Sequence, residues 1–293
     1  MPESSARNSA STPRRGGDQE APAVAKLANG DFVIVWKNFG QSGNSGGMYF
    51  QRYNAGGTKL GEETRVNSNA TSVQHAPAMA ALENGGFVVV WTSPNDGAGS
   101  GVYMRRYDAD GAPLDNAKRC NTFTTGNQAM PSVSGLSNGG YIVAWRSSGQ
   151  DGSGTGIYGQ RFDSQGTKLG AEFRLNNVTA LDQTHPRVAG LGNGGFVGAW
   201  NSDNEDQDLY GIFARRYNSG GGAAGLAFRA NSETDNNQFG AAVTALSNGR
   251  FIIAWHSLSQ DGSGWGVYAQ RFKADSSPAG ESSGLIYRRP GIS

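Results

Sequence analysis

The sequence is poor in cysteine and has no long apolar run, and both scarcities exclude classes of protein. The single cysteine, Cys120, cannot form a disulfide within the chain, and no histidine lies at a recognisable partner position. We therefore expect its thiol to be a small packed side chain rather than a nucleophile. No apolar run reaches the roughly 18 to 20 residues that span a bilayer, so we expect no membrane insertion, and no signal peptide is visible.

The sequence also lacks an excess of one charge. It has 25 Lys and Arg against 24 Asp and Glu, so no net field would attract nucleic acid, and none is expected as a partner. Charged residues are scarce, at 17% against about 25% in typical soluble domains, whereas the 45 glycines are about twice the usual share. This profile favours many short strands joined by tight turns.

A repeat of about 55 residues fills most of the chain. It is marked by tryptophans that close apolar runs such as GGFVVVW, namely Trp36, Trp91, Trp145, Trp200 and Trp255. Asn-Gly pairs precede these runs, an arginine in QRY, RRY or QRF follows each, and a glutamine opens each copy. The spacing predicts an N-terminal segment, 1–18, followed by one domain, 19–293, whose five repeats are 19–73, 74–127, 128–182, 183–237 and 238–293.

Each copy is expected to contain four short strands. The second copy has the segments APAMAAL, GFVVVW, VYMRRY and a weaker one ending in KRCN. The Asn84-Gly85 pair between the first two segments predicts a type I′ hairpin turn, in which both residues have positive φ. No sustained 3.6-residue apolar period is present, so essentially no helix is expected.

The second segment of each copy is apolar on both faces, since Phe87, Val89 and Trp91 alternate with Val88 and Val90. Such a strand needs cover on both sides, and radial stacking provides it. We therefore predict an all-β, monomeric five-bladed β-propeller with four antiparallel strands per blade; an open solenoid is the alternative. Segment 1–18 is expected to close the ring as the outer strand of the fifth blade, unless the chain is a piece of a longer array.

The repeat pattern resembles a known module. It has the form Q-x-x-P, NGGFVVVW-x-S and QDGSG-x-G-x-Y-x-QRF, and it is clearest in GGYIVAWRSSGQDGSGTGIYGQRF of the third copy. In this it is similar to β-propeller repeats of large secreted bacterial proteins that often carry calcium-binding hemolysin-type (RTX) repeats. The resemblance covers residues 19–281 and implies an extracellular or cell-surface location with a binding or adhesive role. Copies one and four depart from it in the DGSG loop.

The candidate ligand-binding residues lie in loops expected to share one polar face of the propeller. They are Gln74, Gln128, Gln183, Gln238, Asn121, Asn176, Asp151, Asp261, Trp265 and Tyr210. The amides could instead cap the connections between blades. For the repeated tryptophans, packing between blades is favoured over sugar stacking. For the repeated arginines, stacking on tryptophan or a bond to a backbone carbonyl is favoured over ligand binding.

Asp203, Asp206 and Asp208 form an acidic loop that could hold Ca²⁺, although its spacing is not that of an EF-hand and a solvated loop is the alternative. No cofactor is expected to be required.

No nucleophile and base pair is evident, since the three histidines, His75, His185 and His256, fall in different phases of the repeat. We therefore expect a non-enzymatic, lectin-like propeller that binds glycans or cell-surface polysaccharide. An adhesive, protein-binding module is an alternative. A polysaccharide-acting enzyme is a second alternative, because a ring can bring acids from different blades within about 5 to 10 Å.

Overall fold

The computed structural model describes residues 17–39, 46–68, 72–94, 97–205 and 209–284, which form five four-stranded sheets and one short 3-10 turn, Ser247–Gly249. Sheet 1 contains β1 (Gln19–Lys26), β2 (Phe32–Asn38), β3 (Gly47–Tyr53) and β4 (Lys59–Arg65). Sheet 2 contains β5 (His75–Ala81), β6 (Phe87–Ser93), β7 (Gly101–Tyr107) and β8 (Lys118–Arg119). Sheet 3 contains β9 (Gln128–Gly135), β10 (Tyr141–Ser148), β11 (Thr155–Phe162) and β12 (Lys168–Arg174). Sheet 4 contains β13 (Gln183–Gly190), β14 (Phe196–Asp203), β15 (Tyr210–Tyr217) and β16 (Phe228–Arg229). Sheet 5 contains β17 (Gln238–Ala245), β18 (Phe251–Leu258), β19 (Trp265–Phe272) and β20 (Ser283–Gly284).

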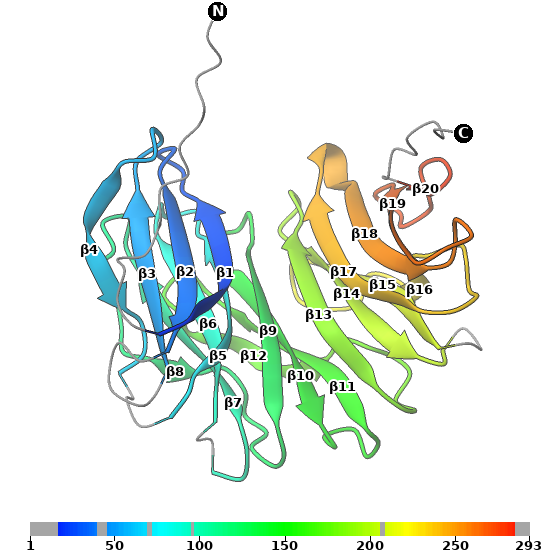
Figure 1. Cartoon of the computed structure of the whole chain (residues 1–293), viewed down its shortest axis with the longest axis horizontal. Coiled ribbons are helices and arrows are strands. Elements are labelled where there is room, and N and C mark those ends of the chain that lie inside the picture. The colour runs from blue at the N-terminus through cyan, green and yellow to red at the C-terminus, as the bar shows by residue number, and fades with distance from the viewer. Residues whose placement is uncertain (1–16, 40–45, 69–71, 95–96, 206–208, 285–293) are drawn as a thin grey trace, which may run out of the picture.

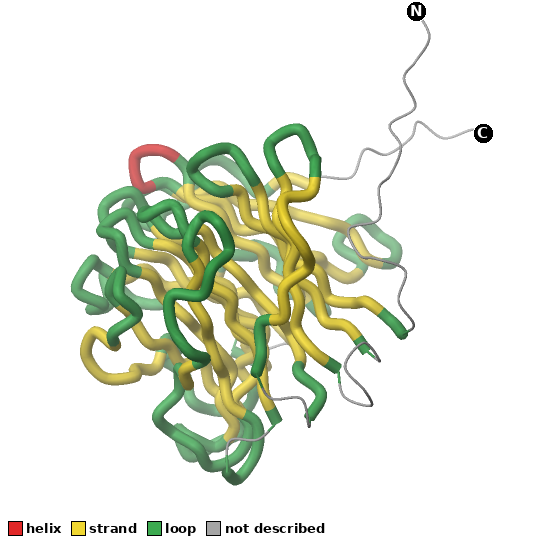
Figure 2. Tube along the Cα trace, turned by 90° about the vertical axis from the view of Figure 1, so that its left-hand side faces the viewer, coloured by secondary structure: helices red, strands yellow, loops and turns green. Residues whose placement is uncertain are grey.

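Strands within each sheet are antiparallel and follow chain order, as the repeat predicts. The sheets are arranged in an arc about a common axis (Figure 1), and their first strands, β1, β5, β9, β13 and β17, contact one another in turn and lie innermost. Loops and turns gather at the two ends of the strands (Figure 2). The part of the chain that the structure describes contains no helix with the length and hydrophobicity of a membrane span.

Four of the five Asn-Gly turns differ from the predicted type. In the turn of sheet 2, Gly85 has positive φ, at 85°, and Asn84 does not; Gly85 N–H donates to the carbonyl of Leu82 while Leu82 N–H donates to that of Gly86. The side chain of Asn84 accepts a hydrogen bond from Gly86 N–H at 3.1 Å. The asparagine therefore stabilises the turn through its Oδ1 and keeps ordinary backbone angles, which is the geometry of a three-residue loop with a glycine bulge. The type I′ prediction was wrong in this turn. Among the five Asn-Gly pairs only Asn248-Gly249 has positive φ at both residues, 61° and 72°, as the prediction required.

The core consists of four apolar clusters, one at each contact between consecutive sheets. The second strand of each sheet points its tryptophan face toward the preceding sheet and its other face toward the next one. Between sheets 2 and 3, for example, Val88 and Val90 pack against Tyr141, Val143 and Trp145. All five repeated tryptophans are at most 2% exposed, and Cys120 is fully buried in the same cluster, so both are packed as expected.

The repeated arginines join consecutive sheets. Those of sheets 1 to 4 each donate from Nη1 to a backbone carbonyl in the turn between the third and fourth strands of the next sheet, as in the 2.5 Å bond from Arg106 to Ser164. The other three pairs are Arg52 with Asp110, Arg161 with Gly220 and Arg216 with Ala274. A charged donor bound to a backbone carbonyl of the next sheet helps to set how the two sheets are placed.

Sheets 1 and 5 each leave much of one face exposed, although Trp36 on that face of sheet 1 is only 2% exposed. They border an opening in the arc between β1 and β17 (Figure 1), and within the described ranges these two strands do not pack together as the other first strands do. The predicted closing segment, 1–18, lies outside the described residues except for Gly17 and Asp18. The structure thus has five sheets of propeller type, in which the first and last sheets face an open seam.

Candidate functional site at the axial mouth

The loops predicted to share one face do so. The first strand of each sheet begins where the second strand ends, since Gln183 pairs with Ser202 in sheet 4 and Gln128 with Ser147 in sheet 3. The loop between strands two and three also meets the next inter-sheet connection, through a bridge between Thr155 and Asp182. We call this end of the arc, where the first strands begin around the axis, the axial mouth.

The predicted amides lie beneath the axial mouth, in the interior. In sheet 3, Asn176 Oδ1 accepts from Ile157 N–H at 2.7 Å, and Asn176 Nδ2 donates to Gln183 Oε1 at 2.9 Å. Gln183 Nε2 in turn donates to the carbonyl of Ala180 at 2.8 Å. The same arrangement joins Asn121 to Gln128, and Asn231 to Gln238. Gln74 is also buried and donates to the carbonyl of Ser72 at 2.9 Å.

The hydrogen-bonding groups of these amides are therefore bound to other groups of the protein. Gln128, Gln183 and Gln238 are fully buried. A buried amide with its donors and acceptors occupied stabilises the connection between sheets. This geometry corresponds to the alternative in which the amides cap the connections between sheets. They would then influence ligand binding only by holding the neighbouring loops in place.

Each first strand contains a β-bulge at the axial mouth. In sheet 3, Met130 and Pro131 lie between the paired residues Ala129 and Ser132, and the bulged Met130 has φ of 56°. The equivalent residues share this backbone geometry, with φ of 51° at Ala21, 46° at Ala76, 53° at His185 and 71° at Gly240. A residue other than glycine is strained in this left-handed backbone region. Bulges of this kind commonly redirect side chains at binding sites. The five bulges thus follow one another around the mouth, along the arc of the first strands.

An axial cavity of about 430 Å³ opens between the first strands. Its lining is mostly small and apolar, with residues such as Pro22, Pro77 and Pro131, and the two ionisable side chains that line it are His185 and Arg187. The cavity is therefore polar on the side of sheet 4. A volume of this size lies in the range of small-molecule sites.

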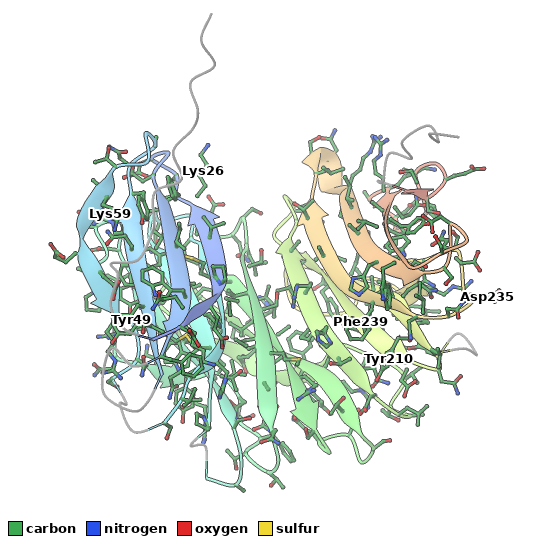
Figure 3. The ribbon with its side chains drawn as sticks, in the orientation of Figure 1. Lys26, Tyr49, Lys59, Tyr210, Asp235 and Phe239 are labelled. Atoms are coloured by element: carbon green, nitrogen blue, oxygen red, sulfur yellow. The ribbon has the colours of Figure 1, made fainter. Side chains whose placement is uncertain are left out.

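Aromatic rings continue from that side onto sheet 5. Phe239 lies 4.6 Å from His185, 5.4 Å from Tyr210 and 5.8 Å from His256, measured between ring centroids. His256 contacts Trp265 edge to face at 4.8 Å. Tyr210 and Phe239 lie side by side in Figure 3. Trp265 is 52% exposed, so the row ends in a ring available to a ligand.

Basic groups surround the same row. Burial lowers the pKa of His185, and the positive charges of Arg187, Arg146 and His256 lower it further. Burial also lowers the pKa of His256. Arg146 Nε is buried and makes no hydrogen bond within the described chain. We call Arg146, His185, Arg187, Tyr210, Phe239, His256 and Trp265 the aromatic-basic rim.

Two carboxylates lie beside this rim. Asp182 accepts a hydrogen bond from Thr155 Oγ1 at 3.0 Å, and Asp203 N–H donates to the carbonyl of Asp182 at 2.9 Å. The pKa of Tyr210 is raised first by burial and then by the negative charges of Asp203 and Asp182, while Arg146 lowers it. The rim therefore combines stacking surfaces, cations and carboxylates within one region.

The opposite side of the mouth is different. There Lys37 is buried, with its Nζ 2.8 Å from Glu20 Oε1, 3.3 Å from His75 Nδ1 and 3.9 Å from the ring centroid of Phe39. Burial and the charge of Lys37 lower the pKa of His75. The lysine is already paired with a carboxylate, so its charge is less available to a ligand than that of Arg146.

The predicted aspartates and aromatic residues lie in or next to the loops between strands two and three. Asp151 and Asp261 lie in turns of the loops between strands two and three, near Ser153 N–H and Ser263 N–H at 3.5 Å. Trp265 and Tyr210 occupy the same position, the first residue of the third strand. Asp203 is half-buried, whereas Asp206 and Asp208 lie outside the described residues. Among the described residues, no group of three or more His, Cys, Asp or Glu side chains is arranged to hold a metal.

Sequence analysis missed Arg146, Arg187 and Phe239. Phe239 follows the repeated glutamine, where the other copies have Glu20, His75, Ala129 and Thr184, and Arg146 follows the repeated tryptophan. One signal in the sequence could have found these residues, namely repeat positions at which the copies differ. The position after the repeated tryptophan is one of them, since it holds Arg146 in the third copy and His256 in the fifth.

Comparison with known proteins finds no matching family model and no matching curated protein. Among solved structures, a protein of unknown function from Dyadobacter fermentans aligns over 92% of this chain and 83% of its own, with 12% identity and a TM-score of 0.65. The NanB sialidase from Streptococcus pneumoniae aligns over 93% of this chain with 8% identity and a TM-score of 0.63, and this chain spans 62% of it. A Penicillium chrysogenum alpha-L-arabinanase complexed with arabinobiose aligns over 91% of this chain and 80% of its own, with 16% identity and a TM-score of 0.57.

These likenesses correct the expectation that the chain is not an enzyme. That expectation treated the propeller as a binding scaffold, whereas the solved structures that share its fold include sialidases, an arabinanase and an arabinofuranosidase. At sequence identities of 8 to 16%, these similarities establish the fold and not the activity. The chain is thus an all-β protein of the β-propeller type, similar in architecture to carbohydrate-active enzymes.

Proposed function

We propose that this chain is a glycan-acting enzyme, a glycoside hydrolase, that binds its substrate across the aromatic-basic rim. The observation that carries the proposal is the loss of repeat symmetry at this rim. At the repeat position that opens or directly precedes the third strand, sheets 1 to 3 have Gly46, Ser100 and Thr155, whereas sheets 4 and 5 have Tyr210 and Trp265. The buried positions of the five copies stay similar, so the chemistry is concentrated where the copies differ.

The rim has the groups that sugar binding uses. The exposed face of Trp265 can stack on the apolar face of a pyranose, and the Tyr210 ring extends the platform. Arg146 and Arg187 supply guanidinium donors for hydroxyl or carboxylate oxygens. Open loops around a cavity of about 430 Å³ suit a few sugar units of a larger glycan.

Asp182 and Asp203 are the proposed catalytic carboxyl groups. Glycoside hydrolysis uses one carboxyl group to protonate the leaving oxygen and a second to activate water or to attack the anomeric carbon. Both residues border the third strand of sheet 4 at Tyr210, and both act on the pKa of its hydroxyl. Replacing either carboxyl group by an amide removes its acid, base or nucleophile function with little change in shape.

The test measures sugar release from a panel of polysaccharides and aryl glycosides, using the chain and the variants D182N, D203N and E62Q. Glu62 is an exposed acid on β4, far along the chain from the rim, and serves as the matched control. We expect kcat/KM to fall about 100-fold or more in the two rim variants, with E62Q unchanged. Glycan binding without turnover anywhere in the panel would contradict the proposal.

A second measurement addresses the platform. W265A is expected to raise KM about three- to tenfold while leaving kcat near its original value, because it removes stacking rather than chemistry. An unchanged KM on every hydrolysed substrate would remove Trp265 from the site. An extracellular location, optional Ca²⁺ binding in the acidic loop that begins at Asp203 and a monomeric state remain predictions. Export assays, activity after chelation and light scattering test them.

A further inference from the structure

One apolar face of sheet 5 is partly exposed. In sheets 1 to 4 the equivalent face is covered by the next sheet along the chain. The clearest position lies in the third strand, where Val102, Ile157 and Ile212 are fully buried and the equivalent Val267 is 43% exposed. In the second strand, Ile252 and Ala254 are partly exposed, whereas the residues equivalent to them in sheets 1 to 4 are buried. The alternating burial of β18 marks this one free face.

Sheet 1 has the complementary free face. Val24 is 65% exposed, whereas the equivalent Met79, Val133 and Val188 are 9%, 8% and 7% exposed. Phe32 and Ile34 on the same face are partly exposed, although the aromatic residue equivalent to Phe32 is fully buried in sheets 2 to 5. Two apolar faces therefore border the seam, and they belong to the two types that pack together four times within the arc.

A polar contact is also incomplete at the seam. The arginines equivalent to Arg271 in sheets 1 to 4 each bind a turn carbonyl of the following sheet. Arg271 is exposed, and its guanidinium has no such bond within the described residues. In sheets 1 to 4 the partner of this arginine is the turn between strands three and four of the following sheet.

We propose that the seam is a docking site for one further four-stranded sheet of this same repeat, joined in tandem at an end of the chain. Such a sheet presents a tryptophan face to Ile252, Ala254 and Val267, and a face of smaller apolar side chains to Val24, Phe32 and Ile34. Its third turn offers the carbonyl for Arg271. Because consecutive sheets follow chain order around the arc and sheets 1 and 5 border the seam, a tandem copy reaches it through the usual short connection.

This occupant continues an interface that the chain already makes four times. In a second copy only the end sheets have a free apolar face, so its sheet 1 could cover the free face of sheet 5 but would bring four further sheets with it. Self-closure into a five-sheet ring is the other competing arrangement. The experiment below separates these three occupants.

The first measurement uses the existing chain with single cysteines. V24C and V267C test the seam, and V133C and V102C are their matched controls at equivalent buried positions. The native Cys120 is buried and contributes little background. We expect maleimide to modify the two seam cysteines at least about 100-fold faster than the controls, independently of protein concentration.

The second measurement appends a copy of residues 128–182 after Ser293 in the V24C and V267C chains. Docking is expected to slow modification of both cysteines about tenfold or more and to raise Tm. A matched control carries Y141D and V143D within the appended copy, which places charge on the face that meets sheet 5. We expect this control to leave V267C exposed.

Four results would overturn the proposal. Protected seam cysteines in the existing chain, with a disulfide between V24C and V267C in the double variant, would show self-closure. Protection that increases with protein concentration would show a second copy at the seam. A folded appended copy that leaves both cysteines exposed would exclude docking. An appended copy that stays unfolded beside a folded chain would do the same, because the seam would then have failed to supply its cover.

Discussion

Sheets 2 to 4 and sheets 1 and 5 have the same sequence pattern but different environments. The inner sheets are covered on both faces, so nearly every residue of β6, β10 and β14 is buried. In β18 of the last sheet, burial alternates along the strand. Position in the arc therefore decides what an apolar residue contributes, and equivalent residues of one type give matched pairs within one molecule.

The largest difference is expected for phenylalanine. Phe196 in sheet 4 is fully buried, and the equivalent Phe32 in sheet 1 lies on the free face and stacks on Tyr53. F196A should lower the free energy of unfolding by about 3 to 5 kcal/mol, and F32A by about half as much, because less cavity forms at a partly exposed site. Urea unfolding of both variants measures this. Equal losses would mean that Phe32 is covered in solution.

Valine gives a smaller and cleaner pair, because Val102 and Val267 occupy the same position in sheets 2 and 5. V102A should cost about 2 kcal/mol, through lost transfer energy and the cavity that remains. V267A should cost less than about 0.5 kcal/mol, as at other exposed positions. Midpoints and slopes of denaturant curves provide the measurement. A V267A loss as large as that of V102A would break the comparison.

Arginine extends the comparison to a polar contact. R161M removes the bond to the carbonyl of Gly220, and we expect a loss of about 1 to 2 kcal/mol. R271M keeps the aliphatic stem and removes no bond that the described residues make, so its unfolding free energy should stay within about 0.5 kcal/mol. Thermal unfolding compares the two. The reverse order would indicate that Arg271 has a partner in solution.

The smallest expected effect concerns the pH dependence of Tm. It compares two histidines at the axial mouth, His185 in sheet 4 and His256 in sheet 5. The pKa of His185 is lowered in the folded chain, so the folded state binds fewer protons than the unfolded state below an ordinary value of about 6.5. Its contribution to stability is complete above that pH and decreases as the pH falls toward the lowered pKa. H185N, which tolerates the positive φ, should therefore reduce the loss of Tm between pH 7.5 and pH 5.

The control for this prediction is H256N. Burial alone lowers the pKa of His256, whereas His185 also feels Arg146, Arg187 and His256. The flattening of the pH profile should be larger for H185N. A larger effect in H256N would show that the charges around His185 are compensated in solution.

The sheets were predictable because their signals are local and repeated. An apolar run with both faces occupied, ended by a tryptophan and preceded by Asn-Gly, identifies the second strand in every copy. The turn type was not predictable, since the Oδ1 of Asn84 satisfies Gly86 N–H without a positive φ at the asparagine. The open seam was equally hidden, because Val267 and Val102 look alike in sequence.

The site was harder to predict than the fold. A repeated amide such as Gln183 is equally suited to binding a ligand and to forming hydrogen bonds inside the protein. Only its burial in the structure distinguishes these two roles. Phe239 and Arg146 come from different sheets and from positions where the copies disagree, so no motif links them. Their proximity to His185 depends on how sheets 3 to 5 are arranged around the axis.

The five bulges give the axial mouth a capacity for change. Evolution or a designed library can alter the left-handed residue of each first strand with little disturbance to the strands, as the present set of Ala21, Ala76, Met130, His185 and Gly240 illustrates. Asparagine and aspartate tolerate this backbone geometry better than other non-glycine residues, so they are the natural first additions at the two alanines. New specificities could thus be introduced one sheet at a time.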